Sequence, residues 1–389
     1  MNSQICEERA ARARLLAVAV MVVLLAAACA ALLVAGRPAA AGDGPAATQM
    51  VLTLRTDGDR EDLWIVTPAG VASKVGTLPG MAGTAAASPD GSMVAYTPEK
   101  GASLWLWEGP GEPKTISLQA AGITGVHGST WIASDKLVIS ASKGGSRYDA
   151  HTARLFTVDV STGGVAPFRS LRGAGPNADI TSGTMVYVRY KKLDNGNARN
   201  HHTPLYRESM MLLDLKGTSA PEELDSAQYR LYFDMAEFNM PTLAAGGDWL
   251  VAGSMGDDPE VTYKVYGGFD ISGLWLTMFE EGPQAAAWAP VGSKLAICGT
   301  LESPGVDSTG ACVYVLDVGS GAMTRTPAGL LDDVAPGWLG GVAWANDGSL
   351  AVDALDSNVP GHSGKVLLIG SGLDTVKDLG EGHLSVWVL

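Results

Sequence analysis

The residues best suited to binding or catalysis gather in five long stretches that separate short apolar runs. Four of the six histidines lie there, together with arginine, tyrosine and aspartate. The stretches cover residues 143–152, 191–204, 255–261, 300–311 and 356–364, and their candidate binding residues are Arg147, Tyr148, His151, Arg199, His201, His202, Asp257, Asp258 and His362. Long loops of a compact protein are commonly functional, so we expect a binding surface here. Tolerated surface insertions are the alternative.

The familiar catalytic and metal-binding motifs do not occur in the sequence. Residues 361–364 read Gly-His-Ser-Gly, but Lys365 stands where a nucleophile elbow needs its last glycine. No H-E-x-x-H occurs, and the four cysteines lack C-x-x-C spacing. His201 and His202 are adjacent, so on a strand they would point to opposite faces. We therefore expect no cofactor, no metal site and no catalysis.

One acidic group stands close to the start of the region rich in apolar runs. Asp57, Asp59, Glu61 and Asp62 could bind calcium weakly, but they lack the glycine and the distant glutamate of a dedicated calcium loop. We interpret this group as a solvated turn.

Two of the cysteines are placed to form a disulfide. Cys298 ends one predicted strand and Cys312 begins the next, and a hairpin symmetric about residue 305 would pair them directly. The same register places Ile297 opposite Val313, which keeps apolar side chains together. Such a bond would stabilise the fold by about 3 kcal/mol in the chain-entropy model, and it needs an oxidising compartment. The alternative is two unpaired, buried apolar residues.

The elements that carry these residues repeat along the chain. Each repeat begins with a strand, a tight turn and a second strand of small and branched apolar residues: AAASPDGSMVAYT (85–97), AAWAPVGSKLAIC (286–298), VAWANDGSLAVDA (342–354) and a weaker copy, STWIASDKLVISA (129–141). An apolar strand that closes in a glycine turn follows, and in four copies an aspartate holds the same place: Asp159, Asp214, Asp270 and Asp317. Such hairpins predict repeated antiparallel sheets, with the aspartates capping turns.

The repeats resemble those of the TolB-type, WD-like β-propeller family, in which an apolar or Trp residue precedes S-P-D-G and the next strand ends in A-F or A-Y. Ser88-Pro89-Asp90-Gly91 with Ala95-Tyr96 matches closely, whereas Trp288 and Trp344 begin partial matches. The resemblance implies an all-β propeller over residues 50–389. Members serve in binding, in periplasmic assemblies and as non-catalytic partners of hydrolase domains, so the fold does not determine the function.

The strand sets also predict how the ring closes. Full sets lie near residues 84–118, 129–171, 177–225, 240–281, 285–327 and 340–379. Strands are left over at both ends, over residues 50–78 and 383–389. Joined in one sheet they would complete a seventh blade and leave no sheet edge open. We expect seven four-stranded blades closed by the N- and C-terminal strands, with six or eight as alternatives.

The first 49 residues read as a membrane anchor and a linker. Residues 15–35 carry no charge and, as a helix, would span about 30 Å, the thickness of a bilayer core. Arginines precede this segment, which predicts that residues 1–14 stay in the cytoplasm. Residues 36–49 are rich in Ala, Gly and Pro and read as a flexible linker. We expect a single-pass signal-anchor; a cleaved signal peptide, giving a secreted protein, and lipidation at Cys29 are the alternatives.

Charge narrows the choice of partner. The formal net charge is −14 and no basic stripe occurs, which argues against nucleic acid as a ligand. Our hypothesis is an exported, membrane-anchored propeller that acts as a non-catalytic binding or scaffold module for a protein, peptide or glycan at the cell envelope. The alternative is a lyase, cyclase or hydrolase with His362, His202 and Asp257 at the central channel. A purely structural module is a third reading.

The arginines before residues 15–35 predict the topology. Protease added to spheroplasts should digest residues 50–389, while an epitope tag at residue 2 stays protected, because the N-terminus is held in the cytoplasm. Immunoblotting of both ends measures this. Protection of residues 50–389 would contradict export.

Overall fold

The computed structural model divides the chain into two units, Met1–Ala47 and Thr48–Leu389, and describes residues of the second only. The described residues are 49–143, 150–195, 204–230, 239–243, 249–255, 260–267, 270–279, 286–300, 311–335, 338–355 and 364–388. Within β16–β19 the backbone is described but, apart from Leu243, not the side chains.

The described strands form seven four-stranded antiparallel sheets. In sheet order they are β28 (His383–Val388), β1 (Met50–Asp57), β2 (Arg60–Val66), β3 (Ala72–Leu78); β4 (Ala82–Ala87), β5 (Val94–Pro98), β6 (Ser103–Trp107), β7 (Lys114–Ser117); β8 (Gly125–Ala133), β9 (Lys136–Ser142), β10 (Arg154–Asp159), β11 (Val165–Arg172); β12 (Ala174–Asp179), β13 (Thr184–Lys192), β14 (Leu205–Asp214), β15 (Glu222–Arg230); β16 (Asn239–Leu243), β17 (Trp249–Met255), β18 (Glu260–Gly267), β19 (Asp270–Phe279); β20 (Ala286–Trp288), β21 (Lys294–Thr300), β22 (Ala311–Asp317), β23 (Ala322–Arg325); and β24 (Trp338–Trp344), β25 (Leu350–Leu355), β26 (Gly364–Ile369), β27 (Val376–Glu381). Two short 3-10 helices are η1 (Gln119–Ala121) and η2 (Ala150–Thr152).

The amino-acid composition of a strand reflects its position in the sheet. The first strands are rich in small residues, as in AGTAAA of β4, because they converge on one axis. Second and third strands are buried on both faces: every residue of β5 is buried, and so are four of the five in β6. Fourth strands such as β7 and β23 are mostly exposed. The apolar content of each strand therefore follows its distance from the outer edge.

The sheets follow one another around the axis through their first strands. Contacts link β4 to β8, β8 to β12, β12 to β16, β16 to β20, β20 to β24, β24 to β28 and β28 back to β4. Each sheet therefore packs face to face against its neighbours, and the apolar faces between them make the core.

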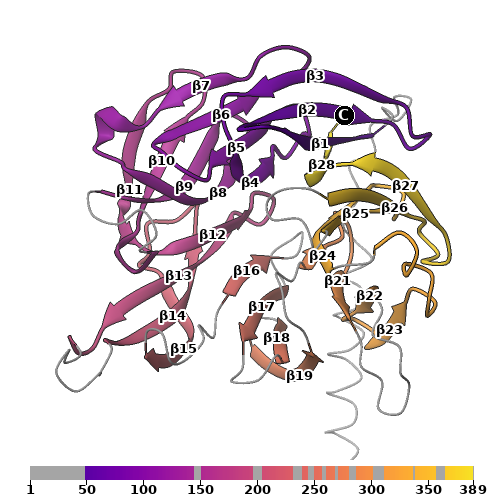
Figure 1. The fold of residues 1–389 in the computed structure, drawn as a ribbon. Coiled ribbons are helices and arrows are strands. Elements are labelled where there is room, and N and C mark those ends of the chain that lie inside the picture. The colour runs from indigo at the N-terminus through magenta and orange to yellow at the C-terminus, as the bar shows by residue number, and fades with distance from the viewer. Residues whose placement is uncertain are drawn as a thin grey trace, which may run out of the picture. The chain divides into compact units, whose positions relative to one another are not determined.

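The two ends of the described chain meet in one sheet. β28 pairs antiparallel with β1, and Figure 1 shows the yellow β28 beside the indigo β1. The predicted pairing of the terminal strand with the sheet that begins at Met50 is confirmed. The register shifts between Leu52 and Leu54, and Leu384 lies at φ 48°, in the left-handed region. Because such backbone is unfavourable for leucine, other contacts must hold this strand in place.

Indole N–H groups bridge neighbouring first strands. Each bridging tryptophan donates to the backbone carbonyl of the preceding sheet, and the bonds are Trp131 Nε1 to Ala86 O (2.9 Å), Trp344 Nε1 to Ala287 O (2.8 Å) and Trp387 Nε1 to Ala343 O (3.0 Å). Between β8 and β12 the backbone N–H of Ala178 donates instead to Thr130 Oγ1 at 3.0 Å. These bonds fix the height of one first strand against the next.

The expected fold, seven blades preceded by a membrane helix, needs correction. Six of the sheets are described with side chains, whereas β16–β19 is described almost only as backbone. Among the described residues no helix is long and apolar enough to cross a membrane. The helix predicted over residues 15–35 lies outside those residues. The described fold is therefore all-β.

The predicted disulfide register is wrong by one residue. Cys298 lies opposite Val313, and Cys312 lies opposite Gly299; likewise Ile297 faces Tyr314. Because side chains alternate between faces, a shift of one residue places the two thiols on opposite sides of the sheet. Both cysteines are buried, and they form no disulfide with each other.

Packing explains why the sequence misled on this point. Both faces of β21 and β22 are apolar, so alternation alone does not select a register. Contacts between the residue before β21 and the end of β22 select the register instead. Ser293 Oγ donates to Asp317 Oδ1 at 3.2 Å, and the backbone N–H of Val318 donates to the Ser293 carbonyl at 3.0 Å. Cys312 Sγ then accepts from Thr326 Oγ1 at 3.4 Å, away from Cys298.

The closing sheet makes a stability prediction. Glu61 on β2 is fully buried, and it accepts from the Ala82 N–H at 2.7 Å and lies 2.7 Å from His383 Nε2. Glu61→Ala leaves these two groups without their partner, so the free energy of unfolding should fall by about 3–5 kcal/mol. Urea denaturation of Glu61→Ala measures this. The exposed Glu112→Ala is the control and should change it by about 0.5 kcal/mol or less; equal effects of the two variants would contradict the closure account.

Candidate functional site

Most of the binding residues expected from the sequence lie outside the described residues. They are Arg147, Tyr148, Arg199, His201, His202, Asp257, Asp258 and His362, and they stay predictions. His151 is the member of the set that is described. Its ring lies 4.8 Å from that of Tyr190 and 4.3 Å from that of Tyr206, centroid to centroid.

One of the tyrosines that contact His151 lies opposite a buried acid. Tyr190 pairs directly with Glu208 across β13 and β14, and Glu208 is fully buried. Burial first, and then the Glu208 charge, raise the pKa of the Tyr190 hydroxyl above its ordinary range. His151 is thus held by packing on tyrosine rings.

A second polar group joins the two ends of the chain. His383 on β28 contacts Glu61 on β2, and its backbone carbonyl accepts from Thr53 Oγ1 at 3.1 Å. Ser385 Oγ donates to Thr53 Oγ1 at 3.1 Å, and the Ser385 N–H donates to Asp353 Oδ2 at 3.1 Å. Asp353 belongs to β25 in the neighbouring sheet, so this group fastens the closing sheet both internally and to its neighbour.

This polar group has the residue types of a catalytic site but not the access. Glu61 is 0% exposed, His383 3% and Asp353 4%. Our interpretation of Glu61 as part of a solvated turn is therefore wrong: residues on either side of it point outward, but its own side chain points inward, toward a histidine 322 positions away. Burial raises the pKa of Asp353 above its usual value. No substrate can reach these groups, so we assign them to ring closure.

Among the described residues, a cavity that a ligand can reach lies at one end of the central axis. It measures about 520 Å³ and is lined by the turns after β4, β12, β20 and β24 together with the last residues of β28. We call it the channel-mouth pocket. Trp288, Trp344 and Trp387 line it, and so do the acids Asp90 and Asp179. The first two tryptophans are half-buried, whereas Trp387 is 8% exposed.

The sequence builds the pocket through the same residues that mark the repeats. Ser88 Oγ donates to Asp90 Oδ1 at 2.6 Å and accepts from the Met93 N–H at 2.9 Å, which shapes the S-P-D-G turn. Gly91 adopts a φ of 70°, which only glycine reaches without strain. The hydrogen bonds from Ser88 and Ser92 lower the pKa of Asp90. Asp90 therefore carries its charge at the rim of the pocket at neutral pH.

The pocket opens on the face opposite to the loops expected to bind. In an antiparallel sheet the turn between the first and second strands lies at the other end from the connection between the second and third. The pocket belongs to the first kind of turn, and residues 143–152 or 191–204 to the second kind. Sequence reasoning missed this site because Trp288, Trp344 and the S-P-D-G motif were interpreted as marks of the fold alone. The recurrence of tryptophan just before these turns was the available signal.

The repeated aspartates cap turns, as predicted, in the three copies whose side chains are described. Asp159 Oδ1 accepts from the Thr162 N–H at 2.9 Å, Asp214 Oδ1 from the Lys216 N–H at 2.8 Å and Asp317 Oδ1 from the Gly319 N–H at 3.0 Å. Hydrogen bonds from Ser161 and Thr162 lower the pKa of Asp159 to about 2. Asp270 lies among residues whose side chains are not described. In the described part of the chain no three His, Cys, Asp or Glu side chains gather as metal ligands.

Comparison with known proteins supports the fold. No family model matches the chain, and no curated protein matches it. Among solved structures, the β-propeller domain of the Trilobed protease from Pyrococcus furiosus is 11% identical with a TM-score of 0.51, over 86% of this chain and 92% of that one. The chain is a β-propeller. That domain is described as having an open velcro topology, whereas here both ends of the propeller share one sheet.

TolB proteins are also among the solved structures that this propeller is similar to. TolB from Acinetobacter baumannii is 14% identical with a TM-score of 0.43, over 88% of this chain and 83% of that one. A prolyl endopeptidase structure is 13% identical with a TM-score of 0.46, over 85% of this chain but 42% of that longer one. At these identities the likeness concerns the fold alone.

The buried Asp353 makes a prediction with a definite sign. Its pKa is raised in the folded state, so folding favours the protonated carboxyl. This contribution to the free energy of unfolding is complete below the unfolded pKa of about 4 and is lost as the pH rises. Asp353→Asn keeps an oxygen that can accept from the Ser385 N–H but cannot ionise. The variant should therefore gain stability relative to the unmodified protein between about pH 4 and pH 8. Urea unfolding at several pH values measures this.

Asp90→Asn is the matched control because the pKa of Asp90 is lowered rather than raised. Its stabilising contribution is present above the unfolded pKa and lost as the pH falls, so Asp90→Asn should lose stability relative to the unmodified protein as the pH rises. The same trend in both variants would contradict the assignment of Asp353 as a buried, costly charge.

Proposed function

We propose that this propeller is a non-catalytic binding module of the cell envelope, which holds a segment of a partner protein in its channel-mouth pocket. The observation that supports the proposal best is the pocket itself: half-buried Trp288 and Trp344 stand among turns from four sheets, at the end of the central axis. Aromatic side chains in a concave site bind well because they offer large, rigid contact surfaces. Placement at the envelope rests on the apolar residues 15–35.

Binding fits the described side chains better than catalysis does. The acids and the histidine that could act as a general acid and base, Glu61, Asp353 and His383, are buried in the closing contacts. The acids at the pocket, Asp90 and Asp179, are engaged by backbone N–H groups of their own turns. The described acids of the pocket shape their own turns, so we infer that the pocket positions a ligand rather than reacting with it.

A partner protein fits the pocket better than a glycan. Sugar binding draws on polar groups that hydrogen-bond hydroxyls, but the carboxylates here already accept from their own turns and the indole N–H groups of Trp344 and Trp387 donate to backbone carbonyls. A volume of about 520 Å³ holds one or two side chains of a protein segment. The glycan is therefore an outcome of the test rather than the proposal.

Site-specific photo-crosslinking in living cells tests the function. Benzoylphenylalanine replaces Val291, which is 77% exposed in the turn next to Pro290 at the pocket. We expect a discrete protein adduct from this position in the full-length protein. Adding Trp288→Ala should reduce its yield several-fold, because a buried aromatic anchor dominates binding at such sites.

The control places the same amino acid at Met323, which is 54% exposed on the outer strand β23 of the same sheet. Equal adducts from Val291 and Met323, or an adduct from Val291 that Trp288→Ala leaves unchanged, would contradict the proposal. A carbohydrate adduct at Val291 would show that the partner is a glycan.

A further inference from the structure

The geometry points to a more specific ligand: we propose that the channel-mouth pocket recognises a cationic side chain, lysine or arginine, presented by the partner. This inference rests on the proposed function and names the chemistry of the group that enters the pocket.

The charge of the pocket favours a cation. Asp90 and Asp179 both line it, and no lysine, arginine or histidine is among the described residues that do. The two carboxylates come from separate sheets, β4–β7 and β12–β15, and so stand at different points of the rim. Hydrogen bonds from Ser88 and Ser92 keep Asp90 ionised. Opposite charge at the mouth of a cleft attracts and orients an incoming cation.

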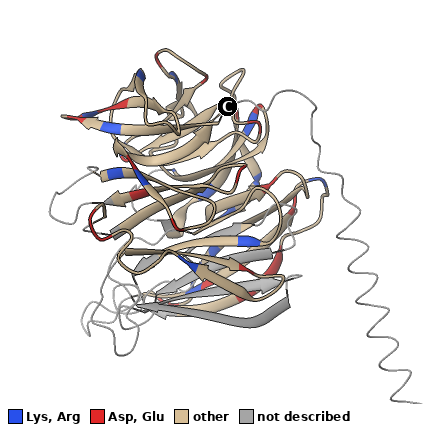
Figure 2. Cartoon of the chain, turned by 90° about the vertical axis from the view of Figure 1, so that its right-hand side faces the viewer, with Lys and Arg blue, Asp and Glu red and all other residues tan. Residues whose placement is uncertain are grey.

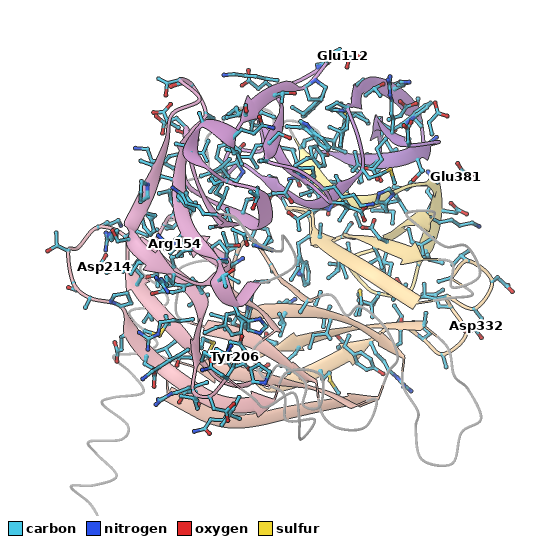
Figure 3. The ribbon with its side chains drawn as sticks, turned by 60° about the vertical axis from the view of Figure 1, so that its left-hand side comes forward. Glu112, Arg154, Tyr206, Asp214, Asp332 and Glu381 are labelled. Carbon is cyan, nitrogen blue, oxygen red and sulfur yellow. The ribbon has the colours of Figure 1, made fainter. Side chains whose placement is uncertain are left out.

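The surface around the pocket is acidic as well. The turns on this face carry the acids Asp90, Glu108, Glu112, Asp135, Asp159, Asp179, Asp214, Asp317, Asp347 and Asp374, against the lysines Lys114, Lys136, Lys216, Lys294 and Lys377. Arg169 adds one further cation, because its guanidinium donates to the carbonyls of the turn after β14. Acidic residues, red in Figure 2, recur at the strand ends, and Figure 3 labels Glu112 and Asp214 on two outer turns. The face as a whole therefore favours approach by a basic segment.

Several of those lysines are already engaged. Lys114 Nζ donates to the Val160 carbonyl at 2.7 Å, Lys216 Nζ to the Thr181 carbonyl at 3.3 Å and Lys377 Nζ to the Pro68 carbonyl at 3.0 Å. Lys114 and Lys377 are thus tied to carbonyls that do not line the pocket. Lys216 lies at the turn that Asp179 begins. Asp90 accepts hydrogen bonds from Ser88 and Ser92 of its own turn.

The tryptophans add a second, independent preference for a cation. The indole N–H of Trp344 donates to Ala287 O, so this ring offers a ligand its carbon surface and π face rather than a hydrogen-bond donor. A π face is electron-rich and attracts ammonium and guanidinium groups, most strongly for tryptophan. An aromatic wall with acids at the rim is complementary to a basic side chain, whose stem is apolar and whose end is charged.

The test measures binding of n-butylguanidinium to the full-length protein by ¹⁹F NMR with 5-fluorotryptophan, using Trp288→Phe to assign the Trp288 resonance. We expect saturable shifts at Trp288. The neutral isostere N-butylurea should bind at least about tenfold more weakly, because it lacks the charge that the tryptophans and carboxylates favour. Raising the salt concentration from 0.05 to 0.5 M should weaken guanidinium binding, because the Debye screening length becomes shorter.

Variants provide the matched control. Asp90→Asn combined with Asp179→Asn should bring the guanidinium affinity down to that of the urea, whereas Asp332→Asn, on the outside of the loop after β23, should leave it unchanged. If the double variant does not fold, the comparison of the two probes on the unmodified protein decides. Equal affinity for both probes, or equal shifts with K⁺ at the same ionic strength, would overturn the preference for a cation. Such a result leaves a Val291 crosslink intact, so failure of this inference is distinct from failure of the proposed function.

Discussion

The structure depends on the pairing of its last strand with its first. A ring of sheets that contact only their neighbours has two open edges unless its ends meet, and an open edge leaves backbone groups unpaired. Here β28 completes the sheet of β1, β2 and β3, and Thr53, Glu61, Asp353, His383 and Ser385 hold it there. The polar contacts offset the irregular register at Leu52–Leu54 and the left-handed backbone of Leu384. Gly382 is part of this fit, because a Cβ there would overlap Thr53 Oγ1.

Closure and the channel-mouth pocket are coupled through the same strand. β28 begins at the buried His383, and near its other end Trp387 lines the pocket and donates to Ala343 O. The indole bonds of Trp344 and Trp131 repeat this link between other first strands. Where such a bond is described, it sets the height of one turn against that of its neighbour. Disturbing the closing strand should change the shape of the pocket as well as the stability of the fold.

The sequence predicted most of the fold because the fold is local and repetitive. Alternating apolar residues and glycine turns specify hairpins, and each expected strand set corresponds to one sheet within a few residues. The terminal residues 383–388 were recognised as a strand from their own alternation. The cysteine register was not predictable in this way, since both faces of β21 and β22 are buried and one residue of shift leaves both apolar. The turn contact between Ser293 and Asp317 decides it, and it depends on side-chain geometry rather than on pattern.

The candidate site was less predictable because its residues serve two purposes. Glu61 stands in an acidic run that resembles a surface turn, and its partner His383 is distant in sequence, so nothing local marks it as buried. Trp288 and Trp344 carry the repeat pattern, and their role at a pocket follows only from the convergence of separate turns. Of the loop residues expected to bind, His151 is the one described, and it packs on Tyr190 and Tyr206.

Native-state hydrogen exchange tests the central claim, that pairing of the terminal strands holds the ring together. If it does, the amides of β28 and β1 should exchange only through global opening, as slowly as those of the fully buried β5. Mass spectrometry or NMR of residues 50–57 and 383–388 provides the rates. Exchange of β28 at the rate of an exposed turn, with β5 still protected, would contradict the account.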